Sequence, residues 1–256
     1  MIEFLEHKQK EVYFDILDDK SRFYSKIVKL TYASGKKFVV SPYFMGGIET
    51  SLVEDLGVYV KGHVSYQPYY DFWHYMINSP ELIVKGIDFF LKDIGTHNLD
   101  FLQGQVNSHF DPLYRGTLCY VLNKITEDGT ITYGEIDKSF ARFNKSSLEK
   151  ITNFSYNGQF SVDILNWKLL ESNNEKSLLL MLPNEIARGL ADTGNNSEEK
   201  NIMNFGKLRK YSTNSKNKVI AACEVRRNIL SPLQNKFDVL EIYEKEDKVG
   251  VIAHNV

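Results

Sequence analysis

The chain has 256 residues, of which 43% are hydrophobic and 25% charged, enough for one globular domain with a full core and a small appended subdomain. Its 31 basic and 33 acidic residues leave a formal charge of -2, which excludes a global attraction to nucleic acid or anionic lipid, so any DNA contact must come from a local patch. No apolar run approaches the roughly 20 residues of a membrane span, and the acidic residues 1–11 do not suit a signal peptide, so we expect a cytoplasmic protein with no membrane partner.

The first third of the chain predicts the opening of a nucleotide-binding unit. The β-rich run 37–41 follows a Ser-Gly turn signal and ends at Pro42, and the run 56–61 predicts a second strand. The interval 48–55 has room for only a short helix. A strand, a short helix and a second strand are how a βαβ nucleotide-binding unit begins.

The middle of the chain predicts helices. Apolar residues at helical spacing predict one helix over 69–75 and another over 80–94. The segment 111–123 begins with Asp111 as an N-cap and a proline in the first turn, and then continues apolar, which predicts a further helix. After it, an Asp-Gly pair among β-formers in 127–134 indicates a hairpin.

The last third predicts buried strands around a polar connection. The continuous apolar run 177–182 is typical of a strand that is buried on both faces of a mostly parallel sheet. The polar segment 191–218 predicts a loop. The segments 218–227 and 237–243 predict two strands joined by a turn around Ser231-Pro232, as an antiparallel finish to an α/β sheet.

The chain has two cysteines, Cys119 and Cys223. They lie far apart and have no His or Cys neighbours at ligand spacing, which argues against a disulfide framework and against a zinc site. We therefore expect a reducing compartment and no metal.

The order and spacing of these pieces, from Asp18 to Tyr243, resemble those of the Dam-like DNA adenine methyltransferases. Members of that family carry Gly-Gly-Lys near the start, where this chain has Asp18-Asp19-Lys20. Their glycine-rich loop reads Glu-Pro-Phe, a small residue and glycines, where this chain has Ser41-Pro42-Tyr43-Phe44-Met45-Gly46-Gly47. A following strand in the family ends in an Asp that holds the cofactor ribose, where this chain has His63.

Other segments are similar to the family's aromatic helix and the turn after it, to the helix ahead of the target-recognition insert, and to the final hairpin. These segments are 71–75, 78–82, 111–115, 120–124, 225–229 and 236–243. The resemblance implies an α/β, Rossmann-like S-adenosylmethionine-dependent methyltransferase fold with a mixed sheet and a small, mostly helical target-recognition insert. It divides the chain into a methyltransferase-like domain over 1–75 and 160–256 and an insert over 76–159.

The family's catalytic tetrad, Asp-Pro-Pro-Tyr at the end of a buried strand, is replaced here by Leu182-Pro183-Asn184-Glu185. In the family the Asp accepts a hydrogen bond from the adenine amine, and the Tyr stacks on the flipped base. Leu182 cannot accept a hydrogen bond, and Glu185 has no ring. Such a hydrogen bond contributes roughly 1.5 to 3 kcal/mol and stacking about 1 to 3 kcal/mol, so losing both removes several decades of rate. The tetrad is degenerate, and we expect no intact catalytic residue.

The cofactor site is degenerate as well. Met45 puts a long side chain where the family has its first glycine, and Ser41 replaces the acid of that loop. His63 replaces a carboxylate that would accept both ribose hydroxyls, and a neutral imidazole has only one acceptor nitrogen. Taken alone, two glycines are equally typical of an ordinary strand-to-helix turn. The degenerate cofactor-binding positions are Lys20, Pro42, Tyr43, Gly46, Gly47 and His63.

Basic residues that the resemblance places near DNA flank the insert, lie in the polar connection and occur in the last part of the chain. They are Arg115, Lys124, Arg142, Lys145, Lys207, Arg209, Lys210, Arg226 and Arg227. Phosphate binding needs such groups, although basic runs also form ordinary solvated surface. Because the insert lacks the family's Asn- and Tyr-rich hairpin, sequence-specific base reading is not expected.

The leading hypothesis is a catalytically inactive Dam-like homologue that binds no cofactor. It would act as a DNA-binding protein or as a partner subunit of a nucleic-acid-processing complex, with a protein partner and double-stranded DNA as the expected binding partners. Two alternatives stay open. One is a divergent but active DNA N6-adenine methyltransferase that uses S-adenosylmethionine, and the other is a pure protein-interaction scaffold.

Overall fold

The structure is a computed structural model, and it describes residues 21–44, 46–93, 99–126, 131, 135, 145–154, 158–166, 176–182, 218–226, 231, 234–235, 237–245 and 248–256. Seven helices lie in these ranges: α1 (Ser21–Ala33), α2 (Gly47–Leu56), α3 (Gln67–Asn78), α4 (Pro80–Asp93), α5 (Leu99–Ser108), α6 (Pro112–Ile125) and α7 (Lys145–Thr152). Seven strands lie there as well: β1 (Phe38–Ser41), β2 (Tyr59–Val64), β3 (Phe160–Ile164), β4 (Leu178–Met181), β5 (Lys218–Arg226), β6 (Asp238–Lys245) and β7 (Lys248–His254).

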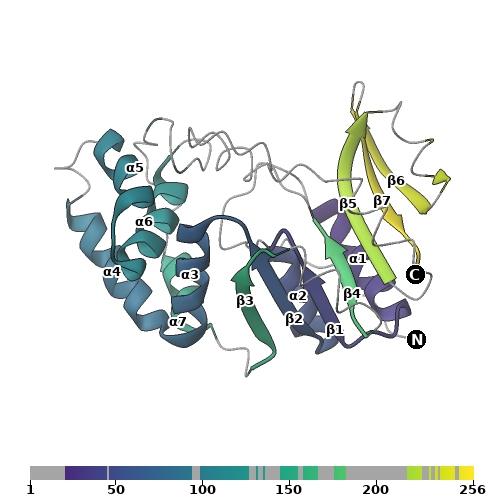
Figure 1. Cartoon of the computed structure of the whole chain (residues 1–256), viewed down its shortest axis with the longest axis horizontal. Coiled ribbons are helices and arrows are strands. Elements are labelled where there is room, and N and C mark those ends of the chain that lie inside the picture. The colour runs from purple at the N-terminus through teal and green to yellow at the C-terminus, as the bar shows by residue number, and fades with distance from the viewer. Residues whose placement is uncertain are drawn as a thin grey trace.

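The strands form one seven-stranded sheet in the order β3-β2-β1-β4-β5-β7-β6 (Figure 1). The first five strands of that order run parallel, and β7 runs antiparallel to both of its neighbours. The α/β class and the mixed sheet are thus confirmed. Every residue of β4 is buried, as expected for a strand that is covered on both faces of a parallel sheet.

The expected pairing of the segments 218–227 and 237–243 is wrong. Both segments form strands, but β7 lies between β5 and β6 and pairs with each of them. β7 is the more apolar strand, and its Val251 is 0% exposed, whereas β6 presents Asp238 and Glu241 to solvent. The apolar strand therefore takes the inner position, and the charged strand takes the edge.

The second strand begins later than its β-rich run predicts. Leu56 still belongs to α2, and Gly57 ends that helix with a φ of 60° while its N–H donates to the carbonyl of Val53. A glycine in this left-handed conformation is a common helix end. The strand therefore starts at Tyr59, three residues after the expected start.

The helices predicted over 69–75, 80–94 and 111–123 are present as α3, α4 and α6. Asp111 caps α6, because its carboxylate accepts hydrogen bonds from the backbone N–H groups of Leu113 at 2.8 Å and Tyr114 at 3.3 Å. The hairpin expected over 127–134 and the loop expected over 191–218 fall almost wholly outside the described residues.

Helices α3 to α7 lie between β2 and β3 in the chain and gather on one side of the molecule, away from α1 and α2 (Figure 1). α3 and α6 approach closely at Gly116, where a Cβ would lie 2.4 Å from the backbone nitrogen of Phe72. Phe72 also stacks on Tyr120, with ring centroids 5.1 Å apart. The division into residues 1–75 with 160–256 and an insert over 76–159 stays a prediction, and its first boundary falls inside α3.

Among the described residues, no helix combines the length and the apolar character that crossing a membrane requires.

Candidate functional site

The candidate site lies at the carboxyl ends of β2, β1 and β4, which are adjacent in the sheet. In parallel α/β sheets, ligands bind beyond the carboxyl ends of the strands, where the strand order reverses. Ser41 ends β1, His63 is the penultimate residue of β2, and Leu182 directly follows β4. The fold therefore brings the positions predicted for the cofactor and for catalysis to one edge of the sheet.

The glycine-containing loop after β1 packs against a tryptophan. Gly46 is the N-cap of α2 and has a φ of 84°, a conformation that side chains other than glycine rarely adopt. A Cβ on Gly46 would lie 2.1 Å from Cζ2 and 2.4 Å from Cη2 of Trp73. Trp73 belongs to α3 and is 0% exposed. The indole therefore occupies the space that the missing side chain leaves.

Phe44 fills the adjoining space at the end of β2. Its ring is 1% exposed and packs edge-on against Trp73 at 4.9 Å and against Phe160 of β3 at 5.0 Å between ring centroids. A Cβ on Gly62 would lie 2.4 Å from Cγ of Phe44, and the Phe44 N–H donates to the carbonyl of His63 at 3.1 Å. The loop after β1 therefore packs directly against the end of β2.

Phe154 completes this group of rings. Its ring centroid lies 6.0 Å from that of Trp73 and 6.3 Å from that of Phe160. Phe44, Trp73, Phe154 and Phe160 thus form one aromatic cluster. These rings come from the loop after β1, from α3, from the segment after α7 and from β3, so segments that are far apart in the chain meet here.

A buried carboxylate lies next to the end of β1. Ser41 donates a hydrogen bond from Oγ to Oε1 of Glu49 at 2.8 Å, and the two residues are 0% and 1% exposed. Glu49 lies in the first turn of α2, where a negative charge interacts favourably with the helix dipole. A carboxylate from α2 therefore lies beside Ser41 at the end of β1, and no sequence pattern indicated this.

His63 is a buried side chain at the end of β2. It is 5% exposed, and burial lowers its pKa below the usual value, helped by the charge of Lys61. Within the part of the chain that the structure describes, its Nδ1 has no hydrogen-bond partner. Lys61 forms an ion pair with Asp163 of β3 at 2.9 Å. The imidazole is therefore a packed side chain with little exposure to a ligand in solution.

Leu182 is 2% exposed and belongs to the main hydrophobic core. The position predicted for the catalytic carboxylate therefore holds an aliphatic side chain that packs inward. Pro42, Tyr43 and Gly46 are buried and Gly47 is partly exposed at the same edge of the sheet. The remaining site positions lie outside the described residues, namely Lys20, Pro183, Asn184 and Glu185.

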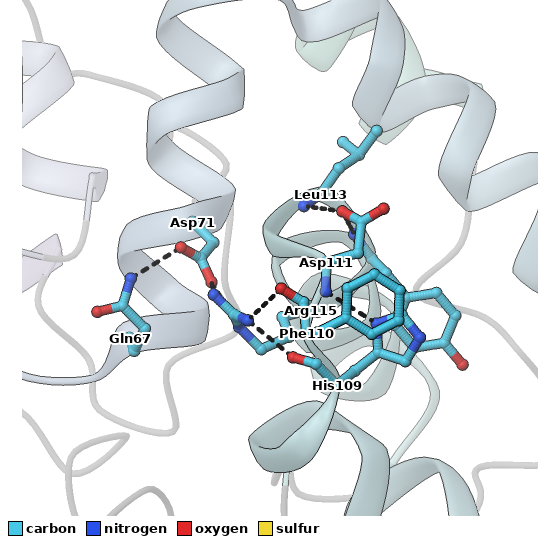
Figure 2. A network of polar contacts seen from close by, with 8 residues as sticks. Gln67, Asp71, His109, Phe110, Asp111, Leu113 and Arg115 are labelled. Atoms are coloured by element: carbon cyan, nitrogen blue, oxygen red, sulfur yellow. Dashed lines mark hydrogen bonds and ion pairs between the residues drawn. The ribbon is translucent and has the colours of Figure 1, made fainter.

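Arg115 connects α6 to α3 (Figure 2). Its guanidinium contacts Oδ2 of Asp71 through Nε at 2.9 Å and Nη2 at 2.8 Å, and its Nη1 donates to the carbonyls of His109 at 2.7 Å and Phe110 at 3.0 Å. Asp71 also accepts a hydrogen bond from Gln67 at 2.9 Å. Arg115 therefore uses its donors to hold two helices and a loop together.

Lys124 is also directed inward. It is 4% exposed, and its Nζ lies 5.6 Å from the centroid of the Tyr120 ring. Contact between DNA and Lys124 would require this side chain to leave its buried position, and contact with Arg115 would compete with the ion pair to Asp71. Lys145 and Arg226 are described as the first residue of α7 and the last of β5. The other predicted DNA contacts lie outside the described residues, namely Arg142, Lys207, Arg209, Lys210 and Arg227.

Comparison with protein-family models gives no match, and neither does comparison with curated protein sequences. Any assignment of function therefore depends on the residues of the chain itself.

Proposed function

We propose that this protein is a catalytically silent relative of the Dam-type DNA adenine methyltransferases that acts by binding, as a partner subunit of a nucleic-acid-processing complex. It keeps a methyltransferase-like scaffold, while the site for cofactor and adenine has become part of the hydrophobic core.

The sheet supports the scaffold. The order β3-β2-β1-β4-β5 is the order of doubly wound nucleotide-binding sheets. The antiparallel β7 between β5 and β6 gives the mixed sheet that the resemblance implies. The helices between β2 and β3 stand where the resemblance implies a target-recognition insert.

The observation that carries the proposal is the contact between Trp73 and Gly46. Glycines in a loop after the first strand leave room for a ligand to approach the backbone. Here the nearest atoms to the missing side chain belong to the protein's own indole. Because protein interiors are close-packed, a ligand that approached Gly46 from the side of its missing Cβ would have to displace Trp73.

Leu182 supports the loss of chemistry independently. A leucine side chain cannot accept the proton of an adenine amine, and this one is buried in the core. The predicted cofactor site, at Gly46, and the predicted adenine site, at Leu182, are thus changed at different residues. Loss of function at two separate positions is what drift after loss of catalysis produces.

A protein partner is favoured over DNA by the positions of Arg115 and Lys124. Phosphate contacts need basic groups that reach the nucleic acid. The donors of Arg115 are directed at Asp71 and at two carbonyl groups, and Lys124 is buried. With a formal charge of -2, the chain also has no overall attraction to DNA.

Isothermal titration of the full chain with S-adenosylmethionine tests the proposal, together with transfer of labelled methyl groups to duplex DNA. We expect no binding heat and no incorporation, with an active adenine methyltransferase as the positive control on the same duplex. Either micromolar binding or methyl incorporation would overturn the proposal, and methyl incorporation would establish the divergent enzyme instead.

A duplex titration at several salt concentrations tests the choice of partner. We expect weak binding without a preferred sequence. Tight binding with a steep dependence on salt would show several phosphate contacts and would favour the DNA-binding form of the hypothesis.

A further inference from the structure

The outer face of α4 carries charges of alternating sign. Glu81, Lys85, Asp88 and Lys92 are all exposed. At about 100° per residue they fall within an arc of about 60° around the helix. The buried residues of α4, which are Ile83, Ile87 and Phe90, lie on the opposite side. The four charges therefore form one stripe, which we call the α4 stripe, directed away from the core.

The α4 stripe is complementary to itself when two copies run antiparallel. A two-fold axis that passes between residues 86 and 87 places Glu81 opposite Lys92 of a second copy and Lys85 opposite Asp88 of a second copy. Both pairings follow from one axis, because 81 and 92 have the same midpoint as 85 and 88. A parallel arrangement in register would instead place like charges opposite each other. In a two-fold interface each of these pairs occurs twice.

An exposed phenylalanine borders the α4 stripe. Phe89 is 55% exposed and lies about 70° from the middle of the stripe around the helix. The same two-fold axis places the Phe89 rings of both copies on the same flank of the helix pair, with their Cα atoms about 7.5 Å apart along the helices. Exposed ion pairs contribute little by themselves, so the two rings supply the apolar burial and the charges set the register.

Ring contacts also connect Phe89 to the aromatic residues on the buried side of α4 and beyond it. Contacts between ring centroids lead from Phe89 to Phe90 at 5.6 Å, to Tyr114 at 4.9 Å, to His109 at 3.9 Å and to Phe110 at 4.8 Å. Phe110 is 86% exposed, and the hydrogen bond from Arg115 to its carbonyl holds its backbone in place (Figure 2). Phe89 is thus backed by a continuous set of packed rings, and an aromatic anchor on such a rigid support is typical of the centre of an interface.

We propose that α4 is the interface of a homodimer in which two copies of this chain pair antiparallel through the α4 stripe and Phe89. The stripe carries two acids and two lysines, so its charges cancel, which disfavours nucleic acid and fits an identical face. α4 lies at the edge of the helical part of the molecule (Figure 1), where a second copy has access to it. This inference does not depend on the proposed function.

Sedimentation velocity of the full chain, from micromolar to submillimolar concentration, tests the homodimer. We expect a reversible equilibrium between monomer and dimer that weakens at high salt. Lys85→Glu places an acid opposite Asp88 of the second copy at two symmetric sites, and it should raise the dissociation constant about tenfold or more. Asp88→Lys should have a similar effect.

The matched control is the double variant Lys85→Glu with Asp88→Lys. It exchanges the two charges and keeps every pair complementary, so its dissociation constant should return to the wild-type value. Phe89→Ser should weaken the dimer while the far-ultraviolet circular dichroism stays unchanged. A wild-type chain that is monomeric throughout, a Lys85→Glu variant with unchanged association, or a double variant that is not rescued would each overturn the proposal.

Discussion

The carboxyl edge of β1 and β2 and the outer face of α4 differ in how their sequence patterns relate to their surroundings. At the sheet edge, Gly46 of the loop after β1 is covered by Trp73, and Gly62 of β2 is covered by Phe44. On α4, charged residues and Phe89 stay exposed, although the amphipathic pattern predicted nothing beyond a helix. A glycine-rich loop therefore has to be interpreted from what touches it, and a surface helix from what it leaves uncovered.

The largest effect is expected at Gly46. Gly46→Val introduces a side chain at a φ of 84° and within 2.1 Å of Trp73. Strain and overpacking together should lower the free energy of unfolding by about 3 to 5 kcal/mol. Urea denaturation followed by circular dichroism measures this loss.

Gly57→Val is the matched control for Gly46→Val. Gly57 also has a positive φ, of 60°, but nothing lies within 4 Å of its missing Cβ. Gly57→Val should lower the free energy of unfolding by only about 1 to 2 kcal/mol. Its valine is also strained at a positive φ, but it meets no neighbouring atom. Equal losses in the two variants would mean that Trp73 does not constrain the loop.

A smaller loss of stability is expected at Arg115. Arg115→Ala leaves Asp71, whose side chain is 4% exposed, without its ion pair, and the free energy of unfolding should fall by about 3 kcal/mol. Arg115→Lys should recover little, because an ammonium group cannot reproduce the contacts to Asp71 and to two carbonyls. Thermal melts of the three proteins give the comparison. If the Arg115→Ala variant were as stable as the wild type, Arg115 would not be needed to hold the helices together. The DNA contact predicted from the sequence would then be the better explanation of this residue.

A pH-dependent effect is expected at His63. Burial lowers the pKa of His63 in the folded state, so protonation favours the unfolded chain. Its contribution to stability is therefore complete above the unfolded pKa of about 6.5 and is lost as the pH falls below that value. His63→Gln should lose less stability than the wild type between about pH 7 and pH 5.

Denaturation series at several pH values measure this difference. Burial also lowers the pKa of His254, so some acid sensitivity should remain in the His63→Gln variant. Parallel pH profiles for the two proteins would show that His63 does not titrate differently on folding.

The smallest effect on stability is expected on α4. Phe89→Ser should change the free energy of unfolding by less than about 0.5 kcal/mol at concentrations where the chain is monomeric, because the ring is already exposed. Chemical denaturation of the dilute protein checks this value. A loss of several kcal/mol would show that Phe89 packs within one chain. The outer face of α4 would then be covered in the same way as the sheet edge, and the two regions would not differ.

Several elements were predictable because their signals are local. The Asp111 cap and the apolar spacing behind it specify α6 within one stretch of chain, and the all-apolar run at β4 indicates burial on both faces. β7 shows where local pattern is insufficient. β5, β6 and β7 all have strand-like patterns, and only the competition for the inner position of the sheet decides which two of them lie side by side.

Part of the candidate site could be predicted from the sequence, because its positions were expected at or just after the ends of strands. The order of elements placed Ser41, His63 and Leu182 at one sheet edge, because parallel strands end together. The occupants of that edge were not predictable. Trp73 contacts Gly46 and Phe160 contacts Phe44 from other parts of the chain. The hydrogen bond between Ser41 and Glu49 depends on a side-chain conformation that no spacing specifies.

By itself, the amino-acid sequence determined part of the elements, among them α3, α4, α6 and β4, together with the α/β class and the absence of a carboxylate at position 182, since these follow from residue type and from short-range periodicity. Only the tertiary structure decided that Trp73 lies against Gly46, that Arg115 is paired with Asp71 and that Phe89 stays exposed. Each of these contacts depends on packing between segments that are distant in the chain, where shape and close approach, rather than local propensity, select the neighbour.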